Sequence, residues 1–328
     1  MIIVTGGAGF IGSNILAGLE KSGYKDLVVV DYMGTGDRWK NIAKRELAHI
    51  VLPEQMHEFL NEHKSEIDAI IHMGAISTTT ETDVDLIVRT NQQLTWYLWE
   101  FCRDNNIRFI YASSAATYGD GSNGFEDRDD LEYLNKLRPL NAYGWSKAFF
   151  DRKVAREIAE NRPTPPQYVG LKFFNVYGPN EYHKGDQQSV IAHIFPAVKA
   201  NEEVKLFKSY NPDYKDGEQL RDFVWVGDIV DVVLWMLSHQ EVSGLFNVGS
   251  GVARSFYDLA LATWNAMELP PKIYFKDMPE TLRGKYQYYT CANLDKLRRV
   301  GYNKPMTTLE NGVKEYVQKY LNQSDMFL

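Results

Sequence analysis

The stretch MIIVTGGAGFIGSNILAGLEK (residues 1–21) decides the fold. A short apolar run ends directly in glycines, and a helical pattern follows over residues 10–21. Gly6, Gly9 and Gly12 recur at three-residue spacing between the predicted strand and the predicted helix. Glycine permits the tight turn and lets backbone N–H groups approach a pyrophosphate at the helix N-terminus. A glycine triplet alone is weak evidence for a dinucleotide site, because glycine-rich turns are common. The elements that flank it decide whether it belongs to such a site.

The next strand supplies those surroundings. Residues 27–31 (LVVVD) read as a second buried strand, and Asp31 ends it about 20 residues after the glycines, as in dinucleotide-binding folds. The Asp31 carboxylate can accept hydrogen bonds from an adenosine ribose, which favours NAD by charge. Arg38, with Lys40 close by, can instead neutralise the 2′-phosphate of NADP, or both can be solvated loop charges. These residues alone do not decide between NAD and NADP.

Short apolar strands alternate with helices through the first half of the chain. Strands are predicted at 69–72, 108–112 and 168–175, and helices at 84–105 and 148–161. This alternation predicts a doubly wound, Rossmann-type α/β fold with a parallel sheet and right-handed crossovers.

The second half of the chain is less regular. Late helices are predicted at 255–267 and 308–321, with loop-like segments at 179–188 and 210–219. We therefore expect an NAD(P)-binding domain over 1–174, to which residues 245–248 return, and a smaller α/β substrate-binding lobe over 175–328.

Composition excludes several classes of function. A net charge of -7 and a pI near 5.6 argue against a nucleic-acid partner. The two cysteines, Cys102 and Cys291, form no CxxC pair or metal-like cluster, so neither a disulfide framework nor a bound metal is expected. No apolar run is long enough to span a membrane, and the start MIIVTGG lacks a signal-peptide pattern. We expect a cytoplasmic protein.

Further motifs occur in a fixed order along essentially the whole chain. They are TGGAGFIG (5–12), HMGAIS (72–77), YASSAATYG (111–119), YGWSK (143–147), FNVYGP (174–179) and RDFVWVGD (221–228). In this order they resemble the extended short-chain dehydrogenase/reductases. The resemblance implies a nicotinamide cofactor and catalysis by Ser114, Tyr143 and Lys147.

The residue types suit those roles. A tyrosine with an ordinary pKa near 10 is a poor base at neutral pH. Lys147 follows Tyr143 by four residues, on the same helical face, where its positive charge is expected to lower that pKa. By resemblance, Lys147 also binds the nicotinamide ribose and Ser114 orients the reacting hydroxyl, while Tyr143 transfers the proton.

Four more segments narrow the resemblance. They are NEYHKG (180–185), KLF (205–207), GLFNVGSG (244–251) and RGKYQYYTCANLDKLRRVGY (283–302), and they are similar to those of the ADP-glyceromanno-heptose 6-epimerases. That family inverts C6 of an ADP-linked heptose used for the lipopolysaccharide inner core. The likeness implies an isomerase with tightly bound NADP, NAD being the other possibility, a homo-oligomer, and Lys184 as a second proton carrier.

The resemblance also implies two sets of binding residues. The expected cofactor contacts are Gly6, Gly9, Phe10, Ile11, Gly12, Asp31, Tyr32, Arg38, Met73, Gly74, Ala75, Ile76, Ser77, Asn91, Tyr143, Lys147, Val176 and Lys184. The expected substrate contacts are Ser114, Asn175, Asp186, His193, Phe207, Lys208, Ser209, Tyr210, Arg221 and Tyr286.

Several of these residues also have purely structural interpretations. His193 lies in an apolar stretch and can equally be a core histidine, and Tyr286 can simply pack against other aromatic rings. Asp186 places a carboxylate near the expected diphosphate, which is favourable only if it points away. His72 is expected to be buried and bonded to the backbone rather than catalytic.

Two other functions compete with this one. The first is a nucleotide-sugar 4-epimerase or dehydratase of the same superfamily. A dehydratase is expected to carry an acidic residue beside Ser114, where this chain has Ala115 and Ala116. The second is a dinucleotide sensor without catalysis, against which the complete set of Ser114, Tyr143 and Lys147 argues.

Overall fold

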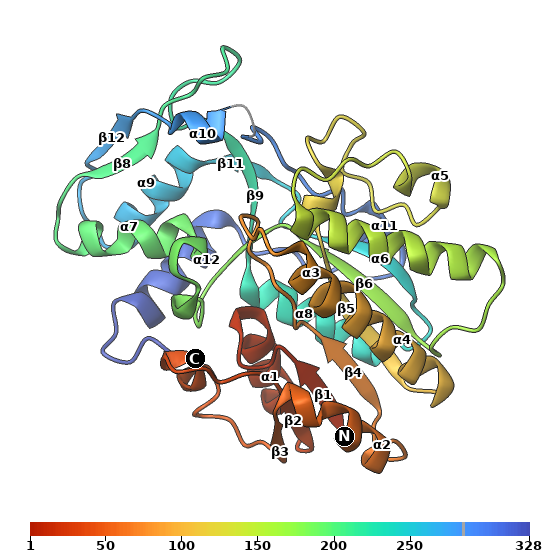
Figure 1. Ribbon diagram of the computed structural model, residues 1–328. Coiled ribbons are helices and arrows are strands. Elements are labelled where there is room, and N and C mark those ends of the chain that lie inside the picture. Colours follow the sequence, from red (N-terminus) through yellow and green to blue (C-terminus); the bar gives the residue numbers. More distant parts are fainter. Residues whose placement is uncertain (284–285) are drawn as a thin grey trace.

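A seven-stranded, entirely parallel sheet forms the centre of the computed structural model, which describes residues 1–283 and 286–328 (Figure 1). Its order is β10-β6-β5-β4-β1-β2-β3. The strands are β1 (Ile2–Thr5), β2 (Leu27–Val30), β3 (His49–Val51), β4 (Ala69–His72), β5 (Arg108–Ser114), β6 (Tyr168–Phe173) and β10 (Gly244–Val248). This arrangement confirms the predicted Rossmann-type α/β fold.

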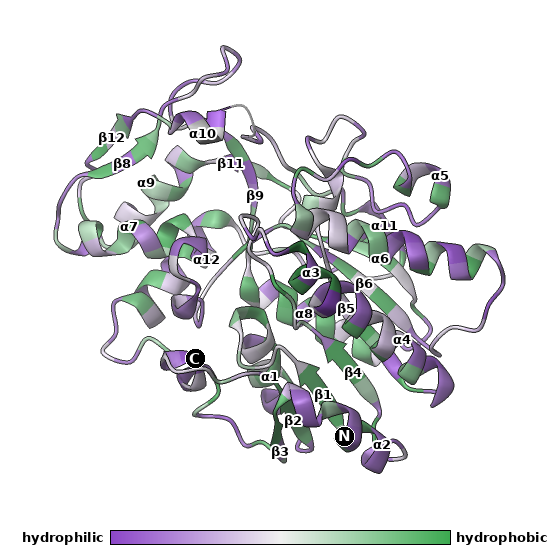
Figure 2. Cartoon of the chain, in the orientation of Figure 1, coloured by the Kyte–Doolittle hydropathy of each residue, from purple (hydrophilic) through white to green (hydrophobic). Residues whose placement is uncertain are grey.

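Helices cover both faces of the sheet. On one face lie α1 (Phe10–Lys21) and α8 (Val226–Ser238), and on the other lie α2 (Met56–His63), α4 (Leu94–Asp104) and α6 (Ala142–Ala159). Successive strand residues point to opposite faces, so Ile2 and Val4 join one core and Ile3 the other. The central strands β1, β2 and β4 are buried on both faces, which explains why they are nearly continuous apolar runs (Figure 2).

Three predicted elements have different boundaries in the structure. The stretch expected at 84–105 is helical but consists of α3 (Val84–Ile87), a π-helical segment η3 (Val88–Gln93) and α4. Helix α6 begins at Ala142 rather than 148, because the Asn141 side chain accepts a hydrogen bond from the Gly144 N–H and caps it there. The strand expected over 168–175 stops at Phe173, and β7 (Asn175–Tyr177) leaves the sheet.

The later part of the chain forms a lobe around two small sheets (Figure 1). β7 pairs with β9 (Leu220–Trp225), which pairs with β11 (Ala253–Ser255), while β8 (Val204–Phe207) pairs with β12 (Ile273–Lys276). Helices α7 (Val190–Lys199), α9 (Phe256–Ala266) and α12 (Leu309–Tyr316) bury Phe195, Leu259 and Val313 against β7 and β9. Strand β10 crosses back to lie beside β6.

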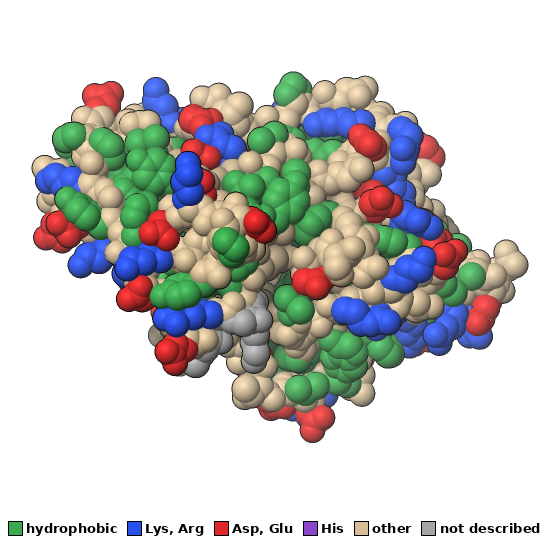
Figure 3. Space-filling view, turned by 90° about the horizontal axis from the view of Figure 1, so that it is seen from above, with side chains coloured by type: hydrophobic (Ala, Val, Ile, Leu, Met, Phe, Trp, Pro, Cys, Tyr) green, Lys and Arg blue, Asp and Glu red, His purple; other side chains and the backbone are tan. Residues whose placement is uncertain are grey.

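Short elements complete the chain. They are η1 (Asp37–Asn41), η2 (Pro53–Gln55), η4 (Ala115–Tyr118), α5 (Leu131–Leu134), η5 (Tyr182–Gln187), α10 (Glu280–Arg283), α11 (Asp295–Arg299) and the π-helical η6 (Val317–Leu321). Across the described ranges, we find no helix with both the length and the apolar character that a membrane span requires. Acidic and basic side chains are interspersed on the face shown in Figure 3.

Candidate active site

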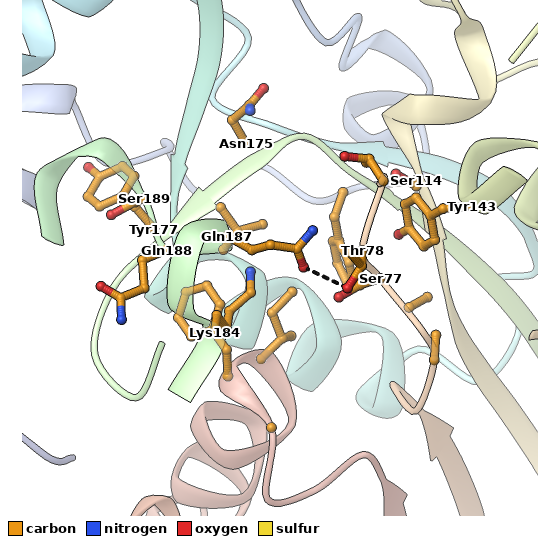
Figure 4. Close-up of a pocket in the computed structure, with 18 of the residues that line it drawn as sticks. Ser77, Thr78, Ser114, Tyr143, Asn175, Tyr177, Lys184, Gln187, Gln188 and Ser189 are labelled. Atoms are coloured by element: carbon orange, nitrogen blue, oxygen red, sulfur yellow. Dashed lines mark hydrogen bonds between the residues drawn. The ribbon is translucent and has the colours of Figure 1, made fainter. Parts of the chain in front are cut away.

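A cavity of about 990 Å³ lies at the carboxyl ends of the central strands, between the large sheet and the later lobe. Ligands of open α/β sheets bind at this edge. The glycine turn after β1 forms its floor, the ends of β5 and α6 form one wall, and η5 forms another (Figure 4).

The glycine turn is shaped to receive a phosphate. Gly6 has a φ of +65°, and a Cβ there would lie 2.6 Å from the backbone nitrogen of Gly74, so only glycine fits. Gly9 begins α1 without any side-chain cap, which leaves the first helical N–H groups directed at the cavity. Phe10, Ile11 and Gly12 also line it. This cradle fits the pyrophosphate of a dinucleotide.

Asp31 and Arg38 lie together beside this turn and line the cavity. Asp31 accepts hydrogen bonds from the backbone N–H groups of Ala8, at 3.0 Å, and Tyr32, at 2.8 Å. Burial raises the pKa of Asp31, and the charge of Arg38 acts in the opposite direction. The Tyr32 side chain is 52% exposed and lies outside the cavity lining.

The loop after β4 forms a further part of the cavity. Met73, Gly74, Ala75, Ile76 and Ser77 all line it. Asn91 does not line the cavity but fixes this loop from behind. Its side chain exchanges hydrogen bonds with the backbone N–H and carbonyl of Ile76, at 2.8 and 2.9 Å.

His72, at the end of β4, is fully buried, as expected, but the predicted backbone bond is wrong. Its two ring nitrogens lie 2.6 Å from the Thr5 hydroxyl and 2.9 Å from the Thr95 hydroxyl. Two neighbouring hydroxyls thus satisfy the ring, and burial lowers the pKa of His72 to about 3.

Ser114 and Tyr143 lie close together on one wall of the cavity (Figure 4), and Lys147 also lines the cavity. Ser114 ends β5, whereas Tyr143 and Lys147 lie in the first turns of α6. A close approach of α6 to the turn after Ser114 brings them together. A Cβ on Gly144 would lie 2.6 Å from the carbonyl oxygen of Ala116, so glycine is required. Gly144 was not among the predicted site residues, although it lies inside the YGWSK motif.

The pKa of Tyr143 is shifted in the opposite direction to the predicted one. Burial raises the pKa of Tyr143, while the neighbouring Ser114 hydroxyl acts to lower it. Lys147 was expected to lower the pKa of Tyr143, but its own pKa falls to about 8 because of burial. Its ammonium donates a hydrogen bond of 2.7 Å to the carbonyl oxygen of Ala112.

Lys184 reaches the cavity from the opposite side, on η5 (Figure 4). Its ammonium nitrogen lies 5.4 Å from the centre of the Phe10 ring. Burial lowers the pKa of Lys184, and the nearby Glu181 carboxylate opposes that change. His183 also lines the cavity. Its Nδ1 lies 3.2 Å from Nδ2 of Asn41, and burial lowers the pKa of His183 to about 4.

A hydrogen bond between two residues that were not predicted to belong to the site crosses the cavity. The Thr78 hydroxyl donates to Oε1 of Gln187 at 3.3 Å, joining the loop after β4 to η5 (Figure 4). Nothing in the local pattern around either residue indicates this pairing, because they are separated by 109 positions in the chain.

Some expected substrate residues line the cavity toward the later lobe. They are Asn175, Asp186, Arg221 and Tyr286, and Val176 from the cofactor set lies beside them. Arg221 is 8% exposed, and its guanidinium carbon lies 5.2 Å from the centre of the Tyr286 ring. Asp186 is solvent-exposed at the rim. Gly284 and Lys285, within the RGKYQ segment, lie outside the described residues.

The other expected substrate residues lie outside the cavity lining. His193 is exposed on α7, so its interpretation as a core histidine is wrong, and its Nε2 lies 3.3 Å from the backbone oxygen of Asp186. Phe207 ends β8. The segment that follows it, Lys208 to Tyr210, contacts Asp277 through a 3.1 Å ion pair from Lys208 and a 3.2 Å hydrogen bond from the Tyr210 hydroxyl. These residues therefore lie together on the β8–β12 side of the lobe.

The fold and site define a class of protein. Residues 2–249 match the model of the NAD dependent epimerase/dehydratase family. The chain belongs to this family, which confirms the predicted nicotinamide-dependent isomerase class.

Comparison with individual known proteins gives more specific likenesses than the family model does. The chain is 49% identical to an ADP-L-glycero-D-manno-heptose-6-epimerase of Fusobacterium nucleatum, with all of both chains aligned. A crystal structure of the enzyme of that name from Helicobacter pylori has a TM-score of 0.78 at 28% identity, covering 97% of this chain and 95% of that one. A Thermus thermophilus UDP-glucose 4-epimerase in complex with NAD has a TM-score of 0.74 at 25% identity, covering 96% and 97%.

Proposed function

We propose that this protein inverts C6 of ADP-D-glycero-D-manno-heptose, giving ADP-L-glycero-D-manno-heptose through a transient 6-keto intermediate. The observation that carries the proposal is the placement of two proton-transferring groups, Tyr143 and Lys184, on opposite sides of one cavity above the glycine turn. The names of its relatives support the choice of sugar.

The cofactor is proposed to be NADP, with NAD as the alternative. The residues that would hold it are the glycine turn after β1, Asp31 and Arg38, and the loop fixed by Asn91. When bound, such a dinucleotide supplies reversible hydride transfer. The Arg38 guanidinium lines the cavity and can meet a 2′-phosphate bidentately.

Inversion requires the sugar to present both faces of C6 to the same reacting position. The C6 oxygen therefore points toward different walls of the cavity before and after inversion. On one wall, Tyr143 exchanges the hydroxyl proton while Ser114 orients the oxygen and Lys147 supplies positive charge. On the opposite side, Lys184 exchanges the proton, helped by a pKa that burial moves toward neutrality.

The substrate diphosphate is proposed to bind Arg221. A guanidinium grips phosphate oxygens through two parallel hydrogen bonds, and that of Arg221 is fixed between the rings of Tyr286 and Phe256. Asn175, at the start of β7, lines the same cavity and can orient the sugar. Asp186 stays compatible with a diphosphate because its side chain lies at the exposed rim.

We propose that residues 1–174, with 245–248, form the cofactor domain and that 175–328 form the substrate lobe. We also propose a cytoplasmic homo-oligomer that serves the lipopolysaccharide inner core. Two free cysteines suit a reducing compartment, and the negative net charge does not favour nucleic acid as a partner.

A direct assay tests this function. Purified protein is mixed with ADP-D-glycero-D-manno-heptose without added cofactor, and the two epimers are separated by chromatography. Conversion to an equilibrium mixture is expected, since the reaction is redox-neutral if cofactor is already bound. Tyr143→Phe serves as the inactive control.

The same assay separates the competing functions. Conversion of a UDP- or GDP-sugar in place of the ADP-heptose would favour a 4-epimerase or a dehydratase. Full retention of activity in Tyr143→Phe would show that the assigned wall does not perform the chemistry.

A further inference from the structure

A buried ion pair lies directly behind the wall that carries Ser114, Tyr143 and Lys147. The Lys172 ammonium lies 2.7 Å from Oδ2 of Asp151, and both side chains are 0% exposed. The Ser113 hydroxyl donates to the same carboxylate oxygen at 2.7 Å. A buried ion pair stabilises a fold little more than apolar side chains of similar volume do. Its position beside the reacting groups therefore suggests a role in the site.

This pair joins the elements that carry the reacting residues. Asp151 lies on α6, one helical turn beyond Lys147 and two beyond Tyr143, on the same face of the helix. Lys172 lies on β6, in register with Ser113 of β5.

A second connection runs through Thr117. The Lys172 ammonium donates to the Thr117 hydroxyl at 2.7 Å, and that hydroxyl donates to the carbonyl oxygen of Ser114, also at 2.7 Å. The ion pair thus contacts Ser113, which precedes Ser114 on β5, and Thr117, which bonds the carbonyl oxygen of Ser114 from the following turn.

We propose that Asp151 is a positioning residue for the epimerase reaction. Held by Lys172 and Ser113, it fixes α6, which carries Tyr143 and Lys147, against β5, which carries Ser114, and its carboxylate attracts the Lys147 ammonium. This inference rests on the proposed function of the same site. Asp151 itself does not line the cavity.

The charges around Lys147 support this role. Burial lowers the pKa of Lys147 to about 8, and the Asp151 carboxylate is the group that opposes this change. His72, on β4, faces Lys147 from the other side, but its pKa of about 3 keeps it neutral at ordinary pH. The Asp151 carboxylate also raises the pKa of Tyr143. Without this carboxylate, Lys147 would lose its proton at a lower pH.

Lys172 is the second charge in the pair and has its own neighbours. Burial lowers the pKa of Lys172, Asp151 and Asp127 act to raise it, and Arg152 acts to lower it. One oxygen of Asp151, Oδ1, has no hydrogen-bond partner among the described residues.

The test compares Asp151→Asn with the wild type. Asparagine has the same shape and keeps an acceptor for Ser113 but removes the charge. We expect kcat to fall by roughly 10- to 100-fold and the alkaline limb of its pH profile to move down by about one pH unit. Asp151→Glu, which restores the carboxylate, is expected to return the limb toward the wild-type position. Asp228→Asn is the matched control, because this aspartate is equally buried but bonds Thr307 away from the cavity.

A second readout does not depend on the sugar. The Tyr143 phenol is titrated by ultraviolet difference absorbance against Tyr143→Phe, once in the wild-type background and once in the Asp151→Asn background. Its pKa is expected to be lower when the carboxylate is absent. If Asp151→Asn does not fold, Asp151→Asn combined with Lys172→Met leaves no unpaired charge and is expected to show the same shifts.

The outcomes separate this proposal from the function on which it rests. A wild-type protein that leaves the ADP-heptose unchanged would overturn the proposed function, while the phenol titration would still test Asp151. An unchanged phenol titration and pH profile in Asp151→Asn, or equal shifts in Asp228→Asn, would overturn the positioning role.

Discussion

The Asp31 carboxylate and the Arg38 guanidinium lie 3.5 Å apart beside the glycine turn. Arg38 also donates a hydrogen bond of 3.2 Å to the carbonyl oxygen of Tyr32. A 2′-phosphate would therefore have to attract Arg38 away from a carboxylate that favours NAD. We propose that the balance between these two side chains sets the preference between NAD and NADP.

Replacing Arg38 by alanine tests that balance. We expect Arg38→Ala to bind NADP about tenfold more weakly or worse, because a charge-assisted contact to phosphate is lost. NAD binding should change little. Equilibrium binding of both dinucleotides measures the ratio, and Lys40→Ala is the control because its ammonium pairs with Asp37 at 3.0 Å. An unchanged NADP/NAD preference in Arg38→Ala would exclude Arg38 as the phosphate ligand.

Gly9 tests the position of the pyrophosphate. A Cβ at Gly9 would lie 3.0 Å from the carbonyl oxygen of Gly6, and a valine there would project its methyl groups at the uncapped start of α1. We expect Gly9→Val to fold but to be purified without dinucleotide. Circular dichroism and the cofactor released on denaturation measure the two effects. Gly36→Val is the control, since a Cβ there meets nothing within 4 Å. Full cofactor content in Gly9→Val would show that the phosphate turn is misplaced.

Lys184 tests the two-residue mechanism. Lys184→Met should fold and retain cofactor, yet lose epimerisation by roughly 10²–10⁴-fold, as expected for a removed general acid or base. Steady-state kinetics separate the effect on kcat from the effect on KM. Lys205→Met, at an exposed position of β8, provides the matched control. A normal kcat with a raised KM would make Lys184 a binding residue only.

The lowered pKa of the buried His72 predicts how the stability of the protein depends on pH. Its folded pKa of about 3 lies below the ordinary value of 6.5, so between these values the unfolded chain binds a proton that the folded chain does not. Stability is therefore lost as pH falls below 6.5. From pH 7 to pH 5 this one site should remove about 2 kcal/mol of unfolding free energy.

Urea unfolding at both pH values measures this loss. His72→Asn should be less stable at pH 7 but should show a correspondingly smaller loss on acidification. His57→Asn, at an exposed histidine, should keep the full wild-type dependence. Equal pH dependence in wild type and His72→Asn would rule out the buried imidazole as its source.

The boundaries of the helices and strands show where the local sequence was sufficient to predict the structure. The predicted helix over 10–21 and the strand over 69–72 match α1 and β4, because apolar periodicity and flanking glycines act within a few residues. The start of α6 was predicted six residues late, since one capping contact from Asn141 outweighs the charged pattern that follows. The end of β6 at Phe173 depends on β7 pairing with β9, a strand about 45 residues further along.

The sequence by itself determined the glycine turn after β1, the Asp31 carboxylate at the end of the next strand, and the spacing of Tyr143 and Lys147, the side chains for which we propose catalytic roles. Each depends on residue type and short spacing, which a helix or a strand converts directly into geometry. Only the tertiary structure decided that Lys184 faces Tyr143 across a cavity, that Phe207 to Tyr210 lie outside its lining, and that Asp151 pairs with Lys172. Those relations join segments that are distant in the chain. They are set by how the two lobes and the sheet pack together, which no local pattern encodes.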